Sequence, residues 1–320
     1  MSKGSSIALS MCLTLGSCVQ TVLSAQKADA VSVPVLVELR SGEIAYGLSA
    51  HDFSIKDNGI EQQISLDTDI SPRALSLVLV IQTGHGAASQ LETITHPEAL
   101  VDSVLTSSQN EIAVISFDGR PQIIQGLTHE SSDVSNSMAS ITAGNSGSAL
   151  FDAIHMAVKL LQASPEKNRK VIVLISGEHD HDSNASDTAS LIRDVSASDA
   201  SVYSLCFLPG KKSLFGKLSS LNPLAMTASA MQRNAPEGLA QLTGGEFYRF
   251  ASQRTFGDRS IEIANHISNR YMLSFRPSRP DPGFHSLQVG VGYSKMDVLS
   301  ARTGYWIADS IVPPVGGGLR

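Results

Sequence analysis

The sequence predicts a doubly wound α/β domain flanked by a β-rich module that both chain ends build. Continuous apolar runs of strand length recur through the middle of the chain, and segments with helical periodicity lie between them. Apolar residues alternate with other residues near both ends. Strands that alternate with helices are typical of a parallel sheet covered on both faces. With 320 residues, the chain is long enough to bury one large core or two smaller ones.

The composition indicates a globular protein and argues against nucleic acid as a partner. Hydrophobic residues make up 42% of the chain and charged residues only 17%, which excludes a disordered chain. The formal net charge is -6, and Lys211 and Lys212 form the only pair of adjacent lysines. The basic surface that a nucleic-acid backbone requires is therefore not expected.

Residues 1–30 are predicted to be an export segment. A basic start is followed by a largely apolar stretch over residues 7–15, and Ala28-Asp29-Ala30 has the small residues of a cleavage signal. Leu15-Gly16-Ser17-Cys18 also matches a bacterial lipoprotein box, so lipidation at Cys18 and simple cleavage remain alternatives. The apolar stretch is too short to span a bilayer. We expect an exported protein that is periplasmic, attached to the outer membrane through lipid, or secreted.

The predicted export segment decides how many cysteines remain in the folded protein. Two of the three cysteines lie within it, which leaves Cys206 in the folded part. No internal disulfide can then form after processing. Because Cys206 lies in an apolar run, we expect it to act as a small buried hydrophobic residue.

Residues 31–72 are predicted to form a β segment. Valines occupy alternate positions from Val31 to Val37, which is the period of a strand with one buried face. Asp57-Asn58-Gly59 is a strong hairpin-turn signal before Ile60.

Residues 73–252 are predicted to form the α/β domain. Its strands are continuous apolar runs, as expected for a sheet buried on both faces. Gly244-Gly245 is expected to end the last helix of this region. The predicted strands are Leu75–Ile81, Ile112–Phe117, Lys170–Ile175 and Val202–Leu208, and the predicted helices are Pro97–Leu105, Ser148–Ala163, Ser186–Ser198 and Pro236–Thr243.

Residues 253–308 are predicted to form one helix and a C-terminal β segment that pairs with residues 31–72. Neither β segment is large enough for a core of its own, so we expect the two to form one unit beside the α/β domain. The tail, 309–320, is expected to be disordered. Leu208 to Asn234 interrupts the α/β pattern and is either a mobile loop or a family-specific contact. The predicted C-terminal strands are Tyr271–Phe275, Ser286–Val291 and Val298–Arg302.

Several short sequence motifs, in the same order along the chain, resemble those of the bacterial von Willebrand factor A-related family. The resemblance runs roughly from Val31 to Tyr305, and it implies a Rossmann-like three-layer domain of von Willebrand factor A type. The motifs are Gly47-Leu48-Ser49-Ala50-His51-Asp52-Phe53, Ser148-Ala149-Leu150-Phe151-Asp152-Ala153, Thr243-Gly244-Gly245, Tyr271-Met272-Leu273-Ser274-Phe275-Arg276-Pro277 and Ala301-Arg302-Thr303-Gly304-Tyr305.

The resemblance also implies a metal ion-dependent adhesion site, and here this chain departs from the family pattern. The family's first loop reads Asp-x-Ser-x-Ser, a second loop supplies Thr and a third supplies Asp. Magnesium prefers octahedral oxygen ligands that include carboxylates. Both carboxylates of the pattern are missing and three positions are glycines, so we expect no magnesium ion there. The degenerate positions, with the neighbouring Thr83, form the expected binding face: Gln82, Thr83, Gly84, Gly86, Ser148 and Gly177.

The first loop also imitates a dinucleotide-binding turn through Gly84-x-Gly86-x-x-Ser89. That fingerprint requires a helix that opens at once and an acidic residue at the end of the second strand, about twenty residues on. Here Asp102 lies in the predicted helix Pro97–Leu105, on the wrong element. Nucleotide binding is therefore not expected.

Residues 178–182, Glu-His-Asp-His-Asp, form a second cluster of metal-ligand types. Imidazole with carboxylate suits zinc or another transition metal ion. Consecutive loop residues cannot all converge on one ion, so a solvated polar loop is the favoured interpretation. His179 and Asp180 remain the candidate ligands of the alternative, with His85 or Asp118 supplied by neighbouring loops.

The favoured function is a non-enzymatic protein-binding or scaffolding module without a cofactor. No Gly-x-Ser-x-Gly elbow follows a strand, and the remaining cysteine is predicted to be buried. The partner is expected to be a protein of the cell envelope or outside it, and contact with the membrane is expected only through Cys18. The alternatives are a metal-binding or hydrolytic protein that uses residues 178–182, and a structural remnant that has lost its ligand.

Overall fold

The computed structural model describes most of the chain between residues 30 and 309. The predictions for the export segment, Cys18, His85 and the C-terminal tail fall outside the described residues. The described ranges are 30–67, 73–84, 86–94, 98–207, 222–293 and 296–309.

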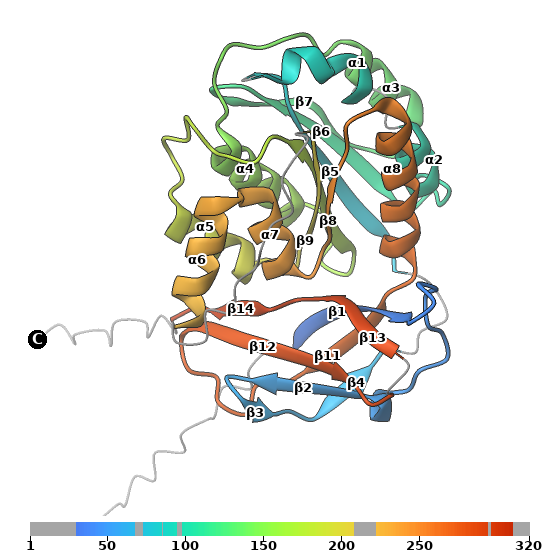
Figure 1. Ribbon diagram of the computed structural model, residues 1–320, viewed down its shortest axis with the longest axis vertical. Helices are drawn as coiled ribbons and strands as arrows, with labels where there is room; N and C mark the ends of the chain where they lie inside the picture. The colour runs from blue at the N-terminus through green and yellow to red at the C-terminus, as the bar shows by residue number, and fades with distance from the viewer. Residues whose placement is uncertain are drawn as a thin grey trace, which may run out of the picture.

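A six-stranded sheet forms the centre of the α/β unit (Figure 1). Its strands are β5 (Leu75–Gln82), β6 (Glu111–Phe117), β7 (Pro121–Thr128), β8 (Arg169–Ser176), β9 (Ser201–Cys206) and β10 (Phe247–Arg249). Their order is β10-β9-β8-β5-β6-β7. The chain starts at β5, adds β6 on one side and then crosses to β8 on the other, so the sheet is doubly wound as predicted. The strand order therefore switches beside the carboxyl ends of β5 and β8.

Helices cover both faces of this sheet, and every residue of β5 is buried between them. Leu77 and Leu79 pack into one core, and Val78 and Val80 pack into the other. The first face carries α1 (Leu91–Ile94), α2 (Glu98–Val104), α3 (Ser131–Ala139) and α8 (Gln253–Ser268). The opposite face carries α4 (Leu150–Gln162), α5 (Thr188–Ala197), α6 (Pro223–Arg233) and α7 (Ala235–Thr243).

The ends of these helices follow their sequence signals. Gly244 has φ +78 and ends α7, as predicted for a C-terminal glycine. Asp187 accepts a hydrogen bond from the Ser190 N–H at the start of α5. None of the described helices combines the length and the apolar composition that crossing a bilayer requires.

Two features of the α/β unit differ from the prediction. The sheet is not wholly parallel, because β7 pairs antiparallel with β6 at the edge. This strand escaped prediction because it is half exposed and carries polar residues and Gly126 instead of an apolar run. In addition, part of the segment 208–234 is the helix α6, which Asn222 caps and Pro223 opens. Residues 208–221 lie outside the described residues.

Strands from both chain ends form two further sheets, which enclose a third core (Figure 1). The Asp57-Asn58-Gly59 turn joins two of these strands, with φ +47 at Asn58 and +82 at Gly59. One sheet has the order β13-β1-β11-β4 and the other β14-β12-β2-β3. The strands are β1 (Val31–Leu39), β2 (Phe53–Asp57), β3 (Ile60–Glu61), β4 (Ile64–Leu66), β11 (Tyr271–Phe275), β12 (Gly283–Val291), β13 (Met296–Ala301) and β14 (Gly304–Ile307).

A buried carboxylate joins this β module to the α/β unit. Glu246, just before β10, accepts hydrogen bonds from Arg270 Nη2 at 2.6 Å, from His266 Nδ1 at 2.6 Å and from the Tyr248 hydroxyl at 2.7 Å. Ser300 of β13 also donates to it, at 3.2 Å. Arg270 precedes β11, so the contact links the central sheet, α8 and the β module.

A buried arginine makes a second link. The Arg302 side chain, which follows β13, is buried and donates to the carbonyl oxygens of Ser196 and Ser198 at 2.6 and 2.8 Å. These oxygens lie at the carboxyl end of α5, where a cation is favoured by the helix dipole. The two links together fix the β module against the amino-terminal edge of the central sheet.

We expect Glu246→Gln to lower the free energy of unfolding at neutral pH by about 3 kcal/mol, because the buried Arg270 would lose its counter-charge. Urea unfolding measures this value. Glu43→Gln changes an exposed carboxylate and should have no effect. An unchanged free energy of unfolding in Glu246→Gln would contradict the proposed link.

The same carboxylate predicts a loss of stability in acid. Burial alone would raise the pKa of Glu246, but the hydrogen bond from His266 and the charge of Arg270 outweigh it and hold the pKa below its ordinary value of 4.5. A lowered folded-state pKa stabilises the fold above the unfolded value, and this contribution is lost as the pH falls through the folded value. The acid dependence below about pH 4.5 should therefore be weaker in Glu246→Gln than in the parent chain.

Candidate functional site

Three loops meet at the carboxyl edge of the central sheet, where the strand order switches. The first follows β5 at Gln82, the second precedes α4 at Ser148, and the third follows β8 at Gly177. Because β5 and β8 are parallel neighbours with Ile81 opposite Ile175, the first and third loops start side by side. The structure therefore gathers the three predicted loops at one rim.

The Gln82 side chain bridges the first and third loops. It is 1% exposed, and its Oε1 accepts a hydrogen bond from the Gly177 N–H at 2.8 Å. Its Nε2 donates to the Gly84 carbonyl oxygen at 3.2 Å. The amide thus serves as acceptor and donor at once, which an ionised carboxylate cannot do.

Gly84 lies where the second loop packs directly on the first. A Cβ atom on Gly84 would lie 2.2 Å from the Gly147 carbonyl oxygen and 2.4 Å from that of Asn145. The Gly144 N–H donates to the Thr83 carbonyl oxygen at 3.0 Å. Backbone thus fills the space beside residue 84 that the family's serine side chain would need.

The two remaining positions of the first loop have different surroundings. The Thr83 hydroxyl is buried and donates to the Phe117 carbonyl oxygen at 3.1 Å. Gly86 is exposed, has φ +83 and has open space where a side chain would start. Of these two residues, Gly86 is exposed, whereas Thr83 is mostly buried.

Ser148 is buried and ties the second loop to the third. Its hydroxyl donates to the His179 carbonyl oxygen at 3.2 Å, and its N–H donates to Asp182 Oδ2 at 2.9 Å. The His181 N–H donates back to the Ser148 carbonyl oxygen at 2.9 Å. The Ser148 hydroxyl and backbone therefore hold the second and third loops together.

Residues 178–182 form a partly exposed polar loop, and two of its carboxylates also hold the start of α4. Asp180 Oδ1 accepts from the Phe151 N–H at 3.0 Å, in the first turn of α4, while Asp182 accepts from Ser148 just before it. Ala149, at the N-cap position of α4, offers no capping side chain. Carboxylates near a helix amino terminus are favoured by its dipole, so this loop caps α4 from outside.

Carboxylates also lie closer to the degenerate site than the sequence indicates. Asp118 Oδ2 accepts from the Asn145 N–H at 2.9 Å, and Oδ1 accepts from the Arg120 N–H at 3.0 Å. The hydrogen bond from the Asn145 backbone holds the pKa of Asp118 below its usual value. A Cβ atom on Gly84 would lie 2.9 Å from the Asp118 Cβ. Asp118 therefore places a negative charge beside the predicted site positions, and its oxygens are occupied by the Asn145 and Arg120 N–H groups and by the Asn145 side-chain amide.

The side chains at the predicted metal-site positions do not fit a magnesium ion. Gln82 and Ser148 both point their polar atoms at backbone groups of adjoining loops, and Gly84 has no room for a ligating side chain. Within the described part of the chain, no three His, Cys, Asp or Glu side chains are grouped so that they could hold a metal ion. The His179 and His181 rings are exposed, with their centroids 6.0 Å apart.

A polar hollow of about 270 Å³ lies beside the locked loops. It opens between the turn after β6 and the loop before α4, and Asp118 and Arg120 contribute opposite charges to its wall. Hydroxyl and amide side chains make up most of the remaining wall. Its polar lining includes Thr83, Ser116, Gln122, Ser140 and Thr142.

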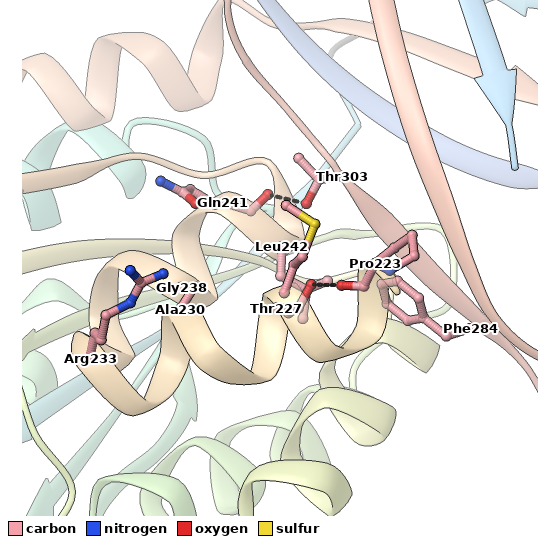
Figure 2. A pocket seen from close by; sticks show the side chains of 10 residues that line it. Pro223, Thr227, Ala230, Arg233, Gly238, Gln241, Leu242, Phe284 and Thr303 are labelled. Atoms are coloured by element: carbon pink, nitrogen blue, oxygen red, sulfur yellow. Dashed lines mark hydrogen bonds between the residues drawn. The ribbon is translucent and has the colours of Figure 1, made fainter. Parts of the chain in front are cut away.

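A second hollow, on the flank of the α/β unit, has a different character (Figure 2). It lies between α6, α7 and β12 and also measures about 270 Å³. The Thr227 hydroxyl donates to the Pro223 carbonyl oxygen, and the Thr303 hydroxyl donates to that of Gln241, both at 3.0 Å. Because the wall satisfies these groups itself, it offers chiefly carbon surface, including Phe284.

Comparison of sequences finds a match over part of the α/β unit. Residues 84–179 match the family model of the von Willebrand factor type A domain. This segment runs from the first loop of the rim to the third. No curated protein matched the sequence.

Solved structures with a related arrangement have low sequence identity to this chain. Conserved hypothetical protein BatB from Bacteroides thetaiotaomicron is 14% identical, with a TM-score of 0.45 over 61% of this chain and 100% of its own. A von Willebrand factor type A structure from Catenulispora acidiphila is 9% identical, with a TM-score of 0.48 over 89% of this chain and 74% of its own. The vWF domain of the type V pili tip protein Mfa5 from Porphyromonas gingivalis is 10% identical, with a TM-score of 0.43 over 62% of this chain and 96% of its own.

We expect Gly84→Ser to destabilise the protein by about 1–3 kcal/mol, because its Cβ would overlap the backbone of the second loop. Thermal or urea unfolding measures the change. Gly119→Ala is the matched control in the adjoining turn, where a Cβ would only make ordinary contact at 3.9 Å. Equal stability of Gly84→Ser and the parent chain would show that the rim has room for the family's ligand.

Proposed function

We propose that this chain, whose α/β unit is a von Willebrand factor type A domain, is an exported, non-enzymatic protein-binding module that recognises its partner without a magnesium ion. The proposal rests on the Gln82 side-chain amide, which accepts a hydrogen bond from the Gly177 N–H and donates one to the Gly84 carbonyl oxygen. These two hydrogen bonds hold the first loop to the third. Domains of this type often mediate protein–protein interaction.

A rim locked in this way suits binding by shape and polar contact. Its loops are already held by buried hydrogen bonds, so binding does not require the loss of conformational entropy that ordering the loops would cause. The surface left to a partner consists of the exposed His179 and His181, Gly86 and the hollow between Asp118 and Arg120. A protein surface with polar side chains of both charges fits this rim.

The hydrolytic alternative gains no support from the geometry. A nucleophilic serine needs a base within hydrogen-bond reach. The Ser148 hydroxyl donates to the backbone oxygen of His179 and not to an imidazole, and Cys206 is buried. Asp180, the candidate metal ligand, is engaged with the start of α4.

The proposed location rests on the amino-terminal residues of the sequence. The predicted export segment, 1–30, supports a periplasmic, outer membrane-attached or secreted protein, and Cys18 supports the lipid anchor as one alternative. A partner in the envelope or outside the cell follows from that location.

Magnesium should leave the melting temperature of the full chain unchanged. An ion that binds the native state at a hundredfold excess over Kd would stabilise it by about 2.7 kcal/mol, which raises the melting temperature by several degrees. Differential scanning calorimetry with magnesium and with chelator provides the measurement. A saturable rise that the chelator abolishes would contradict the proposal.

Partner capture should be independent of metal and sensitive to the rim. We expect the full chain to retain a protein from an envelope extract equally with magnesium and with chelator. The double variant His179→Ala, His181→Ala should retain at least about tenfold less, since exposed side chains at the centre of an interface carry much of the binding energy. His51→Ala, an exposed histidine on the β module, is the matched control. Two results would contradict this function: capture that requires magnesium, or capture by the His179→Ala, His181→Ala variant that equals capture by the His51→Ala control.

A further inference from the structure

A buried cluster of polar side chains lies in the β module, on the inner face of the sheet β14-β12-β2-β3 (Figure 1). His285 of β12 lies directly opposite Tyr305 of β14. Asp57 of β2 lies opposite Leu287, which is two residues beyond His285 and therefore on the same face. The side chains of His285 and Asp57 are only 4% and 3% exposed. The register of the sheet thus brings an imidazole, a carboxylate and a phenol together in a place shielded from solvent.

One ring nitrogen of His285 must carry a proton. Nε2 lies 2.7 Å from the carbonyl oxygen of Asp281, in the connection before β12. A carbonyl oxygen can only accept a hydrogen bond, so Nε2 is the donor. This contact uses the single ring proton that a neutral imidazole carries.

The other ring nitrogen, Nδ1, faces the Asp57 carboxylate. Nδ1 lies 2.9 Å from Asp57 Oδ1, while Oδ2 accepts a hydrogen bond from the Tyr305 hydroxyl at 2.8 Å. Burial and the hydrogen bond to Asp57 raise the pKa of Tyr305, so its hydroxyl keeps its proton and remains the donor. An ionised carboxylate can only accept, so a hydrogen bond between Asp57 and Nδ1 requires a second ring proton. The geometry therefore fits an imidazolium ion.

Further groups around the ring are neutral or engaged elsewhere. Asn58 Nδ2 lies 3.3 Å from Nδ1, a longer contact than the one with Asp57. Arg302, after β13, carries a positive charge that acts on Tyr305, but its side chain donates to backbone oxygens at the end of α5. From the other sheet, β11 contributes the apolar Phe275, whose ring centroid lies 5.9 Å from that of Tyr305. Asp57 is thus the ionised partner of the imidazole.

We propose that His285 forms a pH-sensitive contact that holds the β2–β3 turn and the start of β12 together. As an imidazolium it bridges the Asp57 carboxylate and the Asp281 carbonyl oxygen. When Nδ1 loses its proton, a lone pair faces the buried carboxylate, and Asp57 loses the donor that offsets its charge. A buried charge without a partner is costly, so the turn beside Asp57 then opens. The contact lies within the β module and does not depend on the proposed function.

The direction of the pH effect follows from the number of protons. A proton that the folded chain holds more tightly than the unfolded chain stabilises the fold at low pH, and this contribution is lost as the pH rises. In an unfolded chain, an imidazole loses its second ring proton at about pH 6.5. The contact of His285 should therefore stabilise the β module in weakly acidic and neutral solution, and this stabilisation should disappear in alkaline solution.

Nitrogen-15 nuclear magnetic resonance of the full chain, labelled at histidine, tests the proposal directly. We expect both ring nitrogens of His285 to be protonated at about pH 7.5, one unit above the ordinary value for an exposed imidazole. The exposed His51 of the β module provides the reference in the same spectrum. Loss of the signals in His285→Gln identifies them. A neutral His285 ring at that pH, or a ring that loses its second proton together with His51, would overturn the proposal.

Urea unfolding at about pH 6 and about pH 9 measures the consequence for the fold. The urea midpoint of the parent chain should fall between these two values, and that of His285→Gln should fall by a smaller amount, because glutamine has no proton to lose. His51→Gln is the matched control and should keep the parental fall. An equal fall in His285→Gln and His51→Gln would contradict the proposed contact.

A second variant keeps the test decisive if His285→Gln does not fold. Asp57→Asn leaves the imidazole in place and removes the negative charge that faces Nδ1. Its ring should lose the second proton at a lower pH than the ring of the parent chain, as followed by the same resonance measurement. An unchanged protonation of His285 in Asp57→Asn would show that the carboxylate does not hold the proton, and would overturn the proposal.

Discussion

The Gln82 amide is the contact on which the carboxyl edge of the sheet depends. It lies where β5 and β8 diverge, and it satisfies one donor and one acceptor of the adjoining loops at once. With that contact in place, the second loop packs on Gly84, and Ser148 closes the gap to the third loop. Polar atoms of Gln82 and Ser148 thus hold the backbone of the three loops together.

The sequence predicts the central sheet well because its signal is local. A strand buried on both faces needs a continuous apolar run, and β5 and β8 have such runs. Gly244 ends α7 because a left-handed residue suits glycine. The order of strands and helices also places Gln82, Ser148 and Gly177 at one edge, since parallel strands share their carboxyl ends.

The contacts that decide the chemistry of the rim depend on residues far apart in the chain. Asp180 and Asp182 lie in a polar stretch whose composition is that of a solvated loop, yet they cap a helix about thirty residues earlier. β7 escaped prediction because an edge strand needs no apolar run.

Amide hydrogen exchange at Gly177, followed by nuclear magnetic resonance, tests most directly whether the protein's own hydrogen bonds hold the loops. The Gly177 N–H donates to Gln82, so it should exchange slowly, and its chemical shift should not respond to magnesium. In Gln82→Ala the same amide should exchange much faster. A Gly177 amide that exchanges rapidly in the parent chain, or whose shift moves saturably as magnesium is added, would contradict the account.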